Sequence, residues 1–281
     1  MLSDPRRAED YARDGYVTVQ LLDSDGVAAV RAIREQHGTA PGDPGTGLFN
    51  DTWSIDRTYK RTVSRALLDA MGDAVADTLV EHRILGLVHI VKWPGDGGRV
   101  PAHRDPSFVD EAAHRSAAVW CALEDLGPDD GVLRVVPGSH LLGSGVRVHQ
   151  APENLYPDVD EHADELSVAV PLRAGEAIVY DHRLIHLSDP IGGVRERTVV
   201  AGVMTPAVAA PVYSLSTPLG DVTVGIDEEF FLEHRLDSLD ADEVLRTLPR
   251  AEPAPAAFAP LDLKTLRAAR RRHRRRLRRD H

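Results

Sequence analysis

Short apolar segments separated by tight turns fill the chain between residues 84 and 226, and this pattern limits the possible folds more than any other feature. The turns carry sequences such as PGDGG, GPDDG, PGSH and RAGE, which are rich in residues that end strands. Many short strands at fairly even spacing favour a sandwich, a barrel or a jelly roll over alternating βαβ units. We therefore expect a core made mainly of β-strands.

Helix signals precede this β region. Residues 5–15 follow a Ser-Asp-Pro start and end at a glycine, residues 16–20 alternate as a short strand, and residues 24–38 follow a capping Asp or Ser. Residues 39–60 have the composition of a long loop, whereas residues 63–81 repeat apolar side chains with a period near 3.6. The sequence thus predicts a mainly β protein with flanking helices.

The C-terminal third changes in composition. We expect residues 1–248 to form a single domain, with a short helix in which Phe230 and Phe231 cover the end of the barrel. Residues 249–262 are rich in Pro and Ala and are typical of a linker. Residues 263–281 form a basic tail, which we expect to be a solvated extension or an electrostatic arm, with docking against the acidic body as the alternative.

Charge is distributed unevenly along the chain. The formal net charge is −11, and residues 264–279 hold ten Lys or Arg and no acid, so the rest of the chain carries a charge near −21. A folded body this acidic is not expected to bind nucleic acid by itself. The expected partner is a small-molecule substrate, and the sequence sets no oligomeric state.

Cysteine content and hydropathy indicate the compartment. The single cysteine, Cys121, excludes an internal disulfide, fits a reducing environment and is expected to be a buried apolar residue. No run of about eighteen apolar residues suggests a membrane span, and the N-terminal stretch lacks the apolar segment of a secretory signal. We therefore expect a cytoplasmic protein without membrane association.

A His-x-Asp pair stands just after the PGDGG turn, at His103 and Asp105. Alternate residues of an extended chain project to the same side, so the imidazole and the carboxylate can face one centre. One more histidine would complete the two-histidine, one-carboxylate triad that binds Fe(II) and leaves coordination positions open. On its own, the pair is more typical of a polar surface loop.

Context selects the second histidine from a larger set. The candidates are His89, His114, His140, His149, His162, His182 and His186. His186 is favoured because it follows a tight turn and an apolar strand. A helical zinc pair of His182 and His186 is disfavoured because no Glu follows His182 and the preceding run is typical of a strand. His140, in PGSH, is expected to be a turn residue that supports the wall of the site.

Several sequence blocks then occur in an order typical of one enzyme family. They are His103-Arg104-Asp105, VWCALED, GVLRVVPGSH, GEA, LIHLS and Arg197. With these blocks the chain resembles the phytanoyl-CoA dioxygenase family of Fe(II)/2-oxoglutarate-dependent oxygenases over about residues 10–205. The segment DGYVTVQLLDSDGVAAVRAI is similar to the opening strand and helix of that family. The fold expected from this resemblance is a double-stranded β-helix, the jelly-roll or cupin-like core.

The resemblance implies a role for each matching residue. His103, Asp105 and His186 would bind Fe(II) and carry the catalysis, and 2-oxoglutarate and O2 would be cosubstrates. Three further residues are implied to contact 2-oxoglutarate: Arg197, Ser188 and Trp120. Lys92, which precedes the PGDGG turn, is our own further candidate for a polar contact near the same pocket. Arginine suits the far carboxylate of 2-oxoglutarate because its planar fork binds a carboxylate bidentately and stays charged.

The segment after His186 departs from the usual family pattern and leaves a second arginine as a rival. Arg195 and Arg197 share a face if the strand from Val199 is extended backwards, so alternation does not separate them. Spacing favours Arg197, which stands eleven residues after His186.

The implied reaction is the hydroxylation, or another oxidation, of an unactivated C–H bond with release of succinate and CO2. Related halogenases lack the carboxylate ligand, so Asp105 argues against halogenation. The acidic body disfavours a free acyl-CoA and favours a neutral or cationic substrate, such as a natural-product intermediate, an amino-acid derivative or an aminosugar. The alternatives are a non-catalytic jelly-roll protein that binds metal or ligand as a sensor, and a zinc hydrolase.

Overall fold

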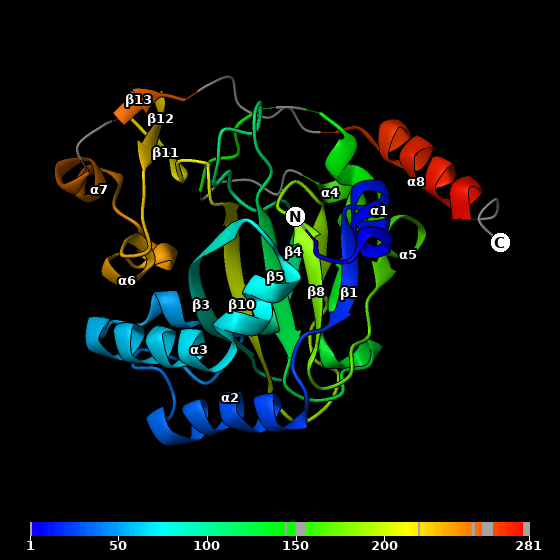
Figure 1. The fold of residues 1–281 in the computed structure, drawn as a ribbon. Helices are drawn as coiled ribbons and strands as arrows, with labels where there is room; N and C mark the ends of the chain where they lie inside the picture. Colours follow the sequence, from blue (N-terminus) through cyan, green and yellow to red (C-terminus); the bar gives the residue numbers. More distant parts are fainter. Residues whose placement is uncertain are drawn as a thin grey trace.

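The computed structural model describes residues 2–143, 145–149, 156–218, 220–248, 251–254 and 261–277. Within these residues two antiparallel sheets form the body of the protein (Figure 1). The larger sheet has the order β1 (Tyr16–Gln20), β8 (Glu176–Asp181), β5 (Ala117–Ala122), β10 (Arg197–Pro206), β3 (His82–Lys92) and β2 (Leu48–Asn50). The smaller sheet has the order β4 (Val100–His103), β9 (His186–Ser188), β6 (Leu133–Val135) and β7 (Val168–Ala169).

The two sheets face each other across an apolar layer. Trp120 of β5 and Ile178 of β8 point inward and pack in one cluster with Leu133 and Val135 of the smaller sheet. Neighbouring residues of the same strands point outward, as Cys121 does. Both faces of the larger sheet are therefore covered, and this explains why its central strands are apolar at almost every position.

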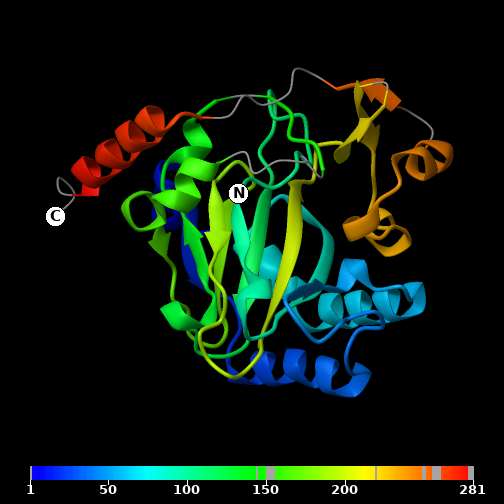
Figure 2. The same cartoon turned by 180° about the vertical axis from the view of Figure 1, so that it is seen from behind.

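Three helices cover the outer face of the larger sheet: α1 (Pro5–Asp14), α2 (Ser24–His37) and α3 (Arg57–Thr78). Figure 2 shows α2 and α3 from behind, at the lower edge of the sheet. The predicted long loop at residues 39–60 is interrupted by β2, and α3 begins six residues before the predicted start at residue 63. The reason is local, because Asp56 accepts hydrogen bonds from Thr58 N and Tyr59 N and caps the helix at that point.

A third sheet with the order β11 (Val212–Thr217), β12 (Gly220–Gly225) and β13 (Ala251–Pro253) lies beside the body together with α6 (Phe230–Glu233) and α7 (Ala241–Thr247). The short helix expected around Phe230 is α6. Phe230 and Phe231 are buried in a cluster with Phe108 and Tyr213. Phe231 also lines the main cavity, so it does more than cover the barrel end.

The outer side of the smaller sheet carries α4 (Pro157–Glu161), α5 (Ala163–Leu166) and α8 (Leu263–Leu277). The basic tail, for which a solvated extension was the first expectation, is helical at α8 and lies against the body. Leu266 is fully buried there, and His273 Nδ1 lies 2.9 Å from Asp14 Oδ1 of α1. Most of the predicted linker, at 249–250 and 255–260, is outside the described residues.

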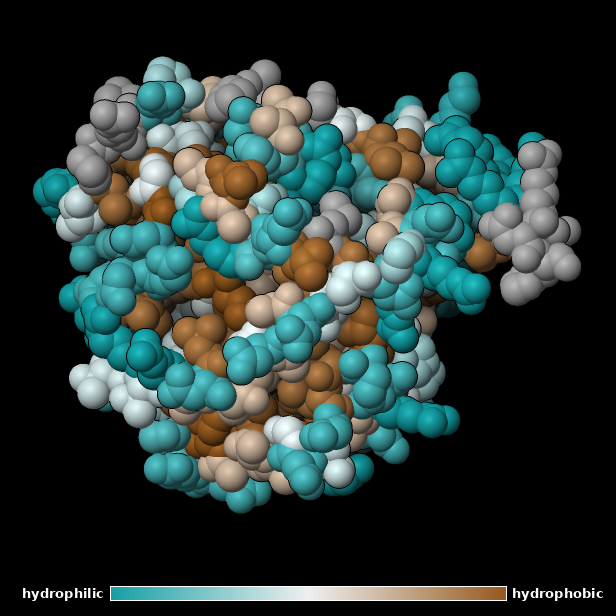
Figure 3. Space-filling view, viewed as in Figure 1, coloured by the Kyte–Doolittle hydropathy of each residue, from teal (hydrophilic) through white to brown (hydrophobic). Residues whose placement is uncertain are grey.

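The outward surface of α8 is hydrophilic (Figure 3). Its buried residues, Leu266, Ala269, Arg270 and His273, recur every three or four positions and form the inner face of the helix. Within the described part of the chain, no helix has both the length and the apolar character needed to span a membrane.

Candidate metal centre and its cavity

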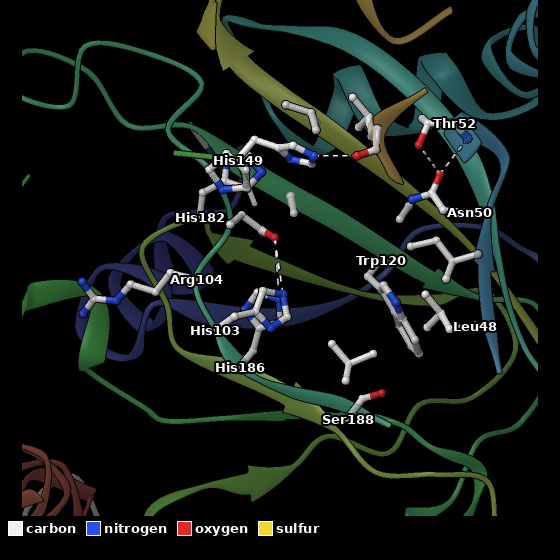
Figure 4. A pocket seen from close by; sticks show the side chains of 18 of the residues that line it. Leu48, Asn50, Thr52, His103, Arg104, Trp120, His149, His182, His186 and Ser188 are labelled. Carbon is white, nitrogen blue, oxygen red and sulfur yellow. Dashed lines mark hydrogen bonds and ion pairs between the residues drawn. The ribbon is translucent and has the colours of Figure 1, made fainter. Parts of the chain in front are cut away.

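His103 and His186 occupy paired positions of two antiparallel strands. His103 ends β4, His186 begins β9, and the two residues face each other in the register of the sheet. Their ring centroids lie 4.2 Å apart, and Figure 4 shows the rings side by side. β4 ends at His103, and the chain beyond it directs the carboxylate of Asp105 towards both rings. Asp105 Oδ1 lies 3.8 Å from His103 Nε2 and 3.8 Å from His186 Nε2.

Both imidazoles present the same nitrogen to this centre. His103 Nδ1 lies 2.8 Å from the carbonyl oxygen of Pro101, and His186 Nδ1 lies 3.0 Å from that of Leu184. A carbonyl only accepts, so each Nδ1 is protonated, and in the neutral form of such an imidazole the lone pair that can bind a metal lies on Nε2. One ligand atom from each of the three side chains lies within 4.8 Å of the others. Two neutral imidazoles and one carboxylate are the donor set of non-haem iron sites.

Electrostatics favour the protonation states that a metal requires in two of these side chains, Asp105 and His186. Burial raises the pKa of Asp105, but the nearby His186, His182 and His103 and a hydrogen bond from Tyr180 outweigh it, so the net pKa lies below the usual value. Burial, with His103 nearby, lowers the pKa of His186 to about 4. At neutral pH the centre therefore holds an ionised carboxylate and an uncharged His186.

A cavity of about 920 Å³ opens over this centre. Its wall combines the inner faces of both sheets with the loop after β4 and the third sheet. The aromatic side chains of this wall are those of Trp53, Phe108, Trp120, Tyr156, Tyr180, Tyr213 and Phe231. Such a volume, lined mainly by apolar groups with a few convergent polar ones, is typical of small-molecule sites.

Arg197 begins β10 and lines the cavity, and its side chain is buried. Its guanidinium carbon lies 4.8 Å from the centre of the Trp120 ring. Its Nε and Nη1 have no hydrogen-bond partner among the described residues, and burial lowers its pKa to about 10. A buried cation with two unused donors indicates that a ligand with an acidic group belongs here. The rival, Arg195, is exposed and does not line the cavity.

Lys92 and Ser188 form a hydrogen-bonded pair behind this arginine. Ser188 lines the cavity, whereas Lys92 is fully buried and is not part of the lining. Lys92 Nζ donates to Ser188 Oγ and, at 2.7 Å, to the carbonyl oxygen of Asp189. Burial, with Arg197 nearby, lowers the pKa of Lys92 to about 7. Lys92 therefore orients Ser188, and because Ser188 Oγ accepts this bond, its own proton is available to a ligand.

Other residues singled out in the sequence are not among the three candidate ligands. His140 lies in a turn, as expected, but it does not line the cavity, and its Nε2 donates to the carbonyl oxygen of Ala12 in α1 at 3.1 Å. His182 follows β8 in a turn and bonds Ser116 Oγ at 2.8 Å, so it forms no helical zinc pair with His186. Cys121 is fully buried, as expected.

Two contacts of the site were missed by sequence reasoning. Tyr180 bonds the carboxylate of Asp105, and its place at an inward position of β8 was the available signal. Arg147 Nε donates to the carbonyl oxygen of Asp105 at 2.7 Å. Arg147 stands 42 residues from Asp105 in the sequence, so no local signal was available for this contact.

Comparison with known proteins decides the family. The model of the family described as phytanoyl-CoA dioxygenase (PhyH) matches residues 11–199, which is more than half of the chain. The chain belongs to the phytanoyl-CoA dioxygenase family. It is 33% identical over 117 residues to phytanoyl-CoA dioxygenase domain-containing protein 1 of Danio rerio, over 39% of this chain and 40% of that protein. It is 33% identical over 107 residues to phytanoyl-CoA dioxygenase of Arabidopsis thaliana, over 37% of this chain and 38% of that protein.

This family member thus spans about two fifths of the length of the curated relatives it matches. Among solved structures it is similar to the epimerase SnoN in complex with Fe3+, alpha ketoglutarate and nogalamycin RO. That match has 23% identity and a TM-score of 0.53, and it covers 92% of this chain and 94% of that one. It is also similar to HygX from Streptomyces hygroscopicus with nickel, 2-oxoglutarate and hygromycin B bound, with 17% identity and a TM-score of 0.52, over 73% of this chain and 88% of that one. These likenesses confirm the jelly-roll fold.

Proposed function

We propose that this protein is an Fe(II)/2-oxoglutarate-dependent oxygenase that oxidises a C–H bond of a small molecule. The observation that carries the proposal is the arrangement of one cavity. It holds two imidazoles and a carboxylate within 4.8 Å of one another and a buried guanidinium with unused donors in the same wall. Membership of the phytanoyl-CoA dioxygenase family supports the same conclusion.

The residues present fit an iron ion and 2-oxoglutarate. His103, Asp105 and His186 would hold the metal, because their donor atoms lie close together and the protonation states of Asp105 and His186 suit it. The bound iron and 2-oxoglutarate supply the oxidation, in which O2 and 2-oxoglutarate give succinate and CO2 while one oxygen atom is inserted into the substrate C–H bond. Asp105 would be the carboxylate ligand that related halogenases lack, which supports hydroxylation or a related oxidation.

The second group of residues fits the far carboxylate of 2-oxoglutarate. Arg197 offers Nε and Nη1, and Ser188 offers its hydroxyl proton, from neighbouring parts of the cavity wall. The indole of Trp120 stacks on the guanidinium and excludes water from it. These residues bind and orient the cosubstrate, and a carboxylate at this place neutralises a cation that is otherwise buried alone.

The charges of the cavity support a neutral substrate. The described lining also contains three further arginines, and each of them has a partner. Arg99 pairs with Asp160, and Arg147 pairs with Glu111. Arg104 donates to the carbonyl oxygens of Ser139 and Leu142. These existing contacts disfavour the binding of the phosphates of a coenzyme A thioester by this lining. The solved structures of SnoN and HygX contain nogalamycin RO and hygromycin B, which supports a natural-product substrate for this chain as well.

We also propose the domain organisation and the compartment. Residues 1–248 act as one oxygenase domain, 249–262 connect it to the tail, and 263–281 form a tail that docks through α8. Cys121 is free and buried, which supports a location of the protein in the reducing cytoplasm. The acidic body supports a small molecule, and not nucleic acid, as the partner of the domain.

Succinate formation tests the proposal. The protein, reconstituted with Fe(II) without oxygen, is supplied with O2, 2-oxoglutarate and a library of neutral natural products. We expect 2-oxoglutarate-dependent succinate that is lost in Asp105→Ala and in Arg197→Ala. Metal binding without succinate across the library would favour the non-catalytic binding protein. Activity that needs no 2-oxoglutarate and survives Arg197→Ala would favour a zinc hydrolase.

A further inference from the structure

We propose that Arg147 is a positioning residue of the metal centre, which sets the place of the carboxylate ligand Asp105 through its main chain. This inference rests on the proposed function, because it assumes that Asp105 binds the metal. It concerns a residue outside the ligand set and outside the 2-oxoglutarate site. Arg147 lies in the segment of residues 145–149, which contributes to the cavity wall.

Asp105 lies beyond the end of its strand, and this position creates the need for a support. The pairing of β4 with β9 ends at His103 and His186, so the sheet fixes both imidazoles but not the residue two places further on. The carbonyl oxygen of Asp105 accepts instead from Arg147 Nε at 2.7 Å. One ligand of the triad is thus positioned by a side chain, whereas the other two are positioned by strand pairing.

Arg147 is itself held in place by a carboxylate. Its Nη1 and Nη2 donate to Glu111 Oε2 and Oε1 at 2.7 and 2.6 Å, and only 5% of its side chain is exposed. Asp105 and Glu111 belong to the same segment after β4, so the guanidinium of Arg147 bridges two positions of that segment. The guanidinium thus donates from all three of its nitrogen atoms, Nη1 and Nη2 to Glu111 and Nε to Asp105.

The main chain around Arg147 completes a hydrogen-bonded wall. Arg147 N donates to Ser107 Oγ at 3.2 Å, and Ser107 N donates to the carbonyl oxygen of Arg147 at 3.1 Å. Two residues later, His149 N donates to the carbonyl oxygen of Ser214 in β11 at 2.9 Å. The segment that carries Arg147 is therefore fixed on one side to the ligand segment and on the other to the third sheet.

We expect a loss of metal affinity when the guanidinium of Arg147 is removed. Groups that orient metal ligands typically contribute 10- to 100-fold to metal affinity. Arg147→Met keeps the apolar length of the side chain but leaves the Asp105 carbonyl without its donor. Arg147→Lys keeps the charge but cannot donate to Asp105 and to both oxygens of Glu111 in one plane. We expect both variants to bind metal about 10- to 100-fold more weakly than the natural chain.

The experiment titrates the metal-free, full-length protein with Co(II), in the absence of 2-oxoglutarate and substrate. Affinity is measured by calorimetry and the ligand field by the visible Co(II) spectrum, and thermal unfolding of each metal-free variant is measured in parallel. Arg13→Met is the matched control, because Arg13 also forks onto a carboxylate, that of Asp14, but on α1 and away from the cavity. We expect Arg13→Met to leave Co(II) affinity unchanged.

A second variant separates positioning from folding. Glu111→Gln keeps the shape of the side chain but weakens the clamp on Arg147, so we expect a smaller loss of Co(II) affinity with a native circular dichroism spectrum. Natural Co(II) affinity and spectrum in folded Arg147→Met would overturn the role of Arg147, whatever its unfolding temperature, and would leave the proposed function intact. A natural chain that binds no Co(II) would instead overturn the metal site and this inference with it.

Discussion

Lys92 and Arg197 face each other on the neighbouring strands β3 and β10, and both side chains are buried. Residues directly opposite in a sheet point to the same face, so two cationic side chains share one region of the interior. Lys92 has Ser188 and a carbonyl group as partners, whereas two nitrogen atoms of Arg197 have none among the described residues. A buried cation with unused donors lowers the stability of the ligand-free protein, so this arrangement favours binding of a dicarboxylate.

Replacing Arg197 by methionine should separate binding from stability. Because the charge is buried and two of its donors are unused, we expect Arg197→Met to raise the free energy of unfolding by about 1 kcal/mol. The same change should abolish 2-oxoglutarate binding, as measured by calorimetry on the metal-loaded protein without oxygen. Arg195→Met is the control, and it should alter neither quantity because Arg195 is exposed. Natural 2-oxoglutarate affinity in Arg197→Met would contradict the assignment.

Stability should depend on pH through Lys92. Burial lowers its pKa to about 7, below the ordinary value of 10.5, so between these values the unfolded chain binds more protons than the folded one. The free energy of unfolding therefore rises with pH in this window, by about 2 kcal/mol between pH 7 and pH 9 from this residue. Urea unfolding at both pH values should show a smaller rise in Lys92→Met.

The quantity to compare is the rise of the unfolding free energy with pH, in the natural chain and in Lys92→Met. Burial also lowers the pKa of Lys60, to about 8, and this residue contributes in the same window in both proteins. An equal rise with pH in the natural chain and in Lys92→Met would show that Lys92 is not the group responsible.

Removing the carboxylate ligand should abolish metal binding and leave the fold. Asp105 lies outside any strand, and its side chain faces the two imidazoles and not the apolar core. We expect Asp105→Ala to lose Fe(II) binding, measured as iron content after anaerobic reconstitution, with an unchanged circular dichroism spectrum. Asp164→Ala serves as control, since the Asp164 side chain is 98% exposed. Full iron content in Asp105→Ala would contradict the triad.

Docking of α8 should contribute to stability but not to chemistry. Leu266 is fully buried among residues of the smaller sheet and of α4 and α5, so we expect Leu266→Ala to lower the free energy of unfolding by about 2 to 3 kcal/mol. Leu277→Ala, at a position that is 37% exposed, should change it by less than about 0.5 kcal/mol. Turnover of the free substrate should be retained in both variants. A large loss of turnover in folded Leu266→Ala would show that the tail takes part in the site.

The sequence predicted the strands, and the proximity of His103, Asp105 and His186, because both depend on local sequence patterns. Strands such as β5 and β10 are short apolar runs between turn residues, and His103, Asp105 and His186 stand in ordered motifs. The choice between the two arginines needed the structure. β10 begins at Arg197, so Arg195 belongs to an exposed turn, and the backward extension of strand alternation was not valid there.

Features that depend on distant segments could not be predicted in the same way. Arg147 contacts Asp105 and Glu111 because a hydrogen bond to the third sheet helps to hold the segment 145–149 beside the segment after β4. The docking of α8 had a signal, because Leu266 and His273 lie on one helical face, but the surrounding positive charges are more typical of a solvated run.

The contact between Trp120 and Arg197 gives this protein an internal optical reporter. The guanidinium lies over the indole, and a dicarboxylate that binds it changes the electric field next to the chromophore. The chain has three tryptophans, and Trp93 lies outside the described cavity lining, so a Trp93→Phe background leaves emission from the cavity alone. Fluorescence can therefore follow cosubstrate arrival in real time, without a label and without knowledge of the substrate.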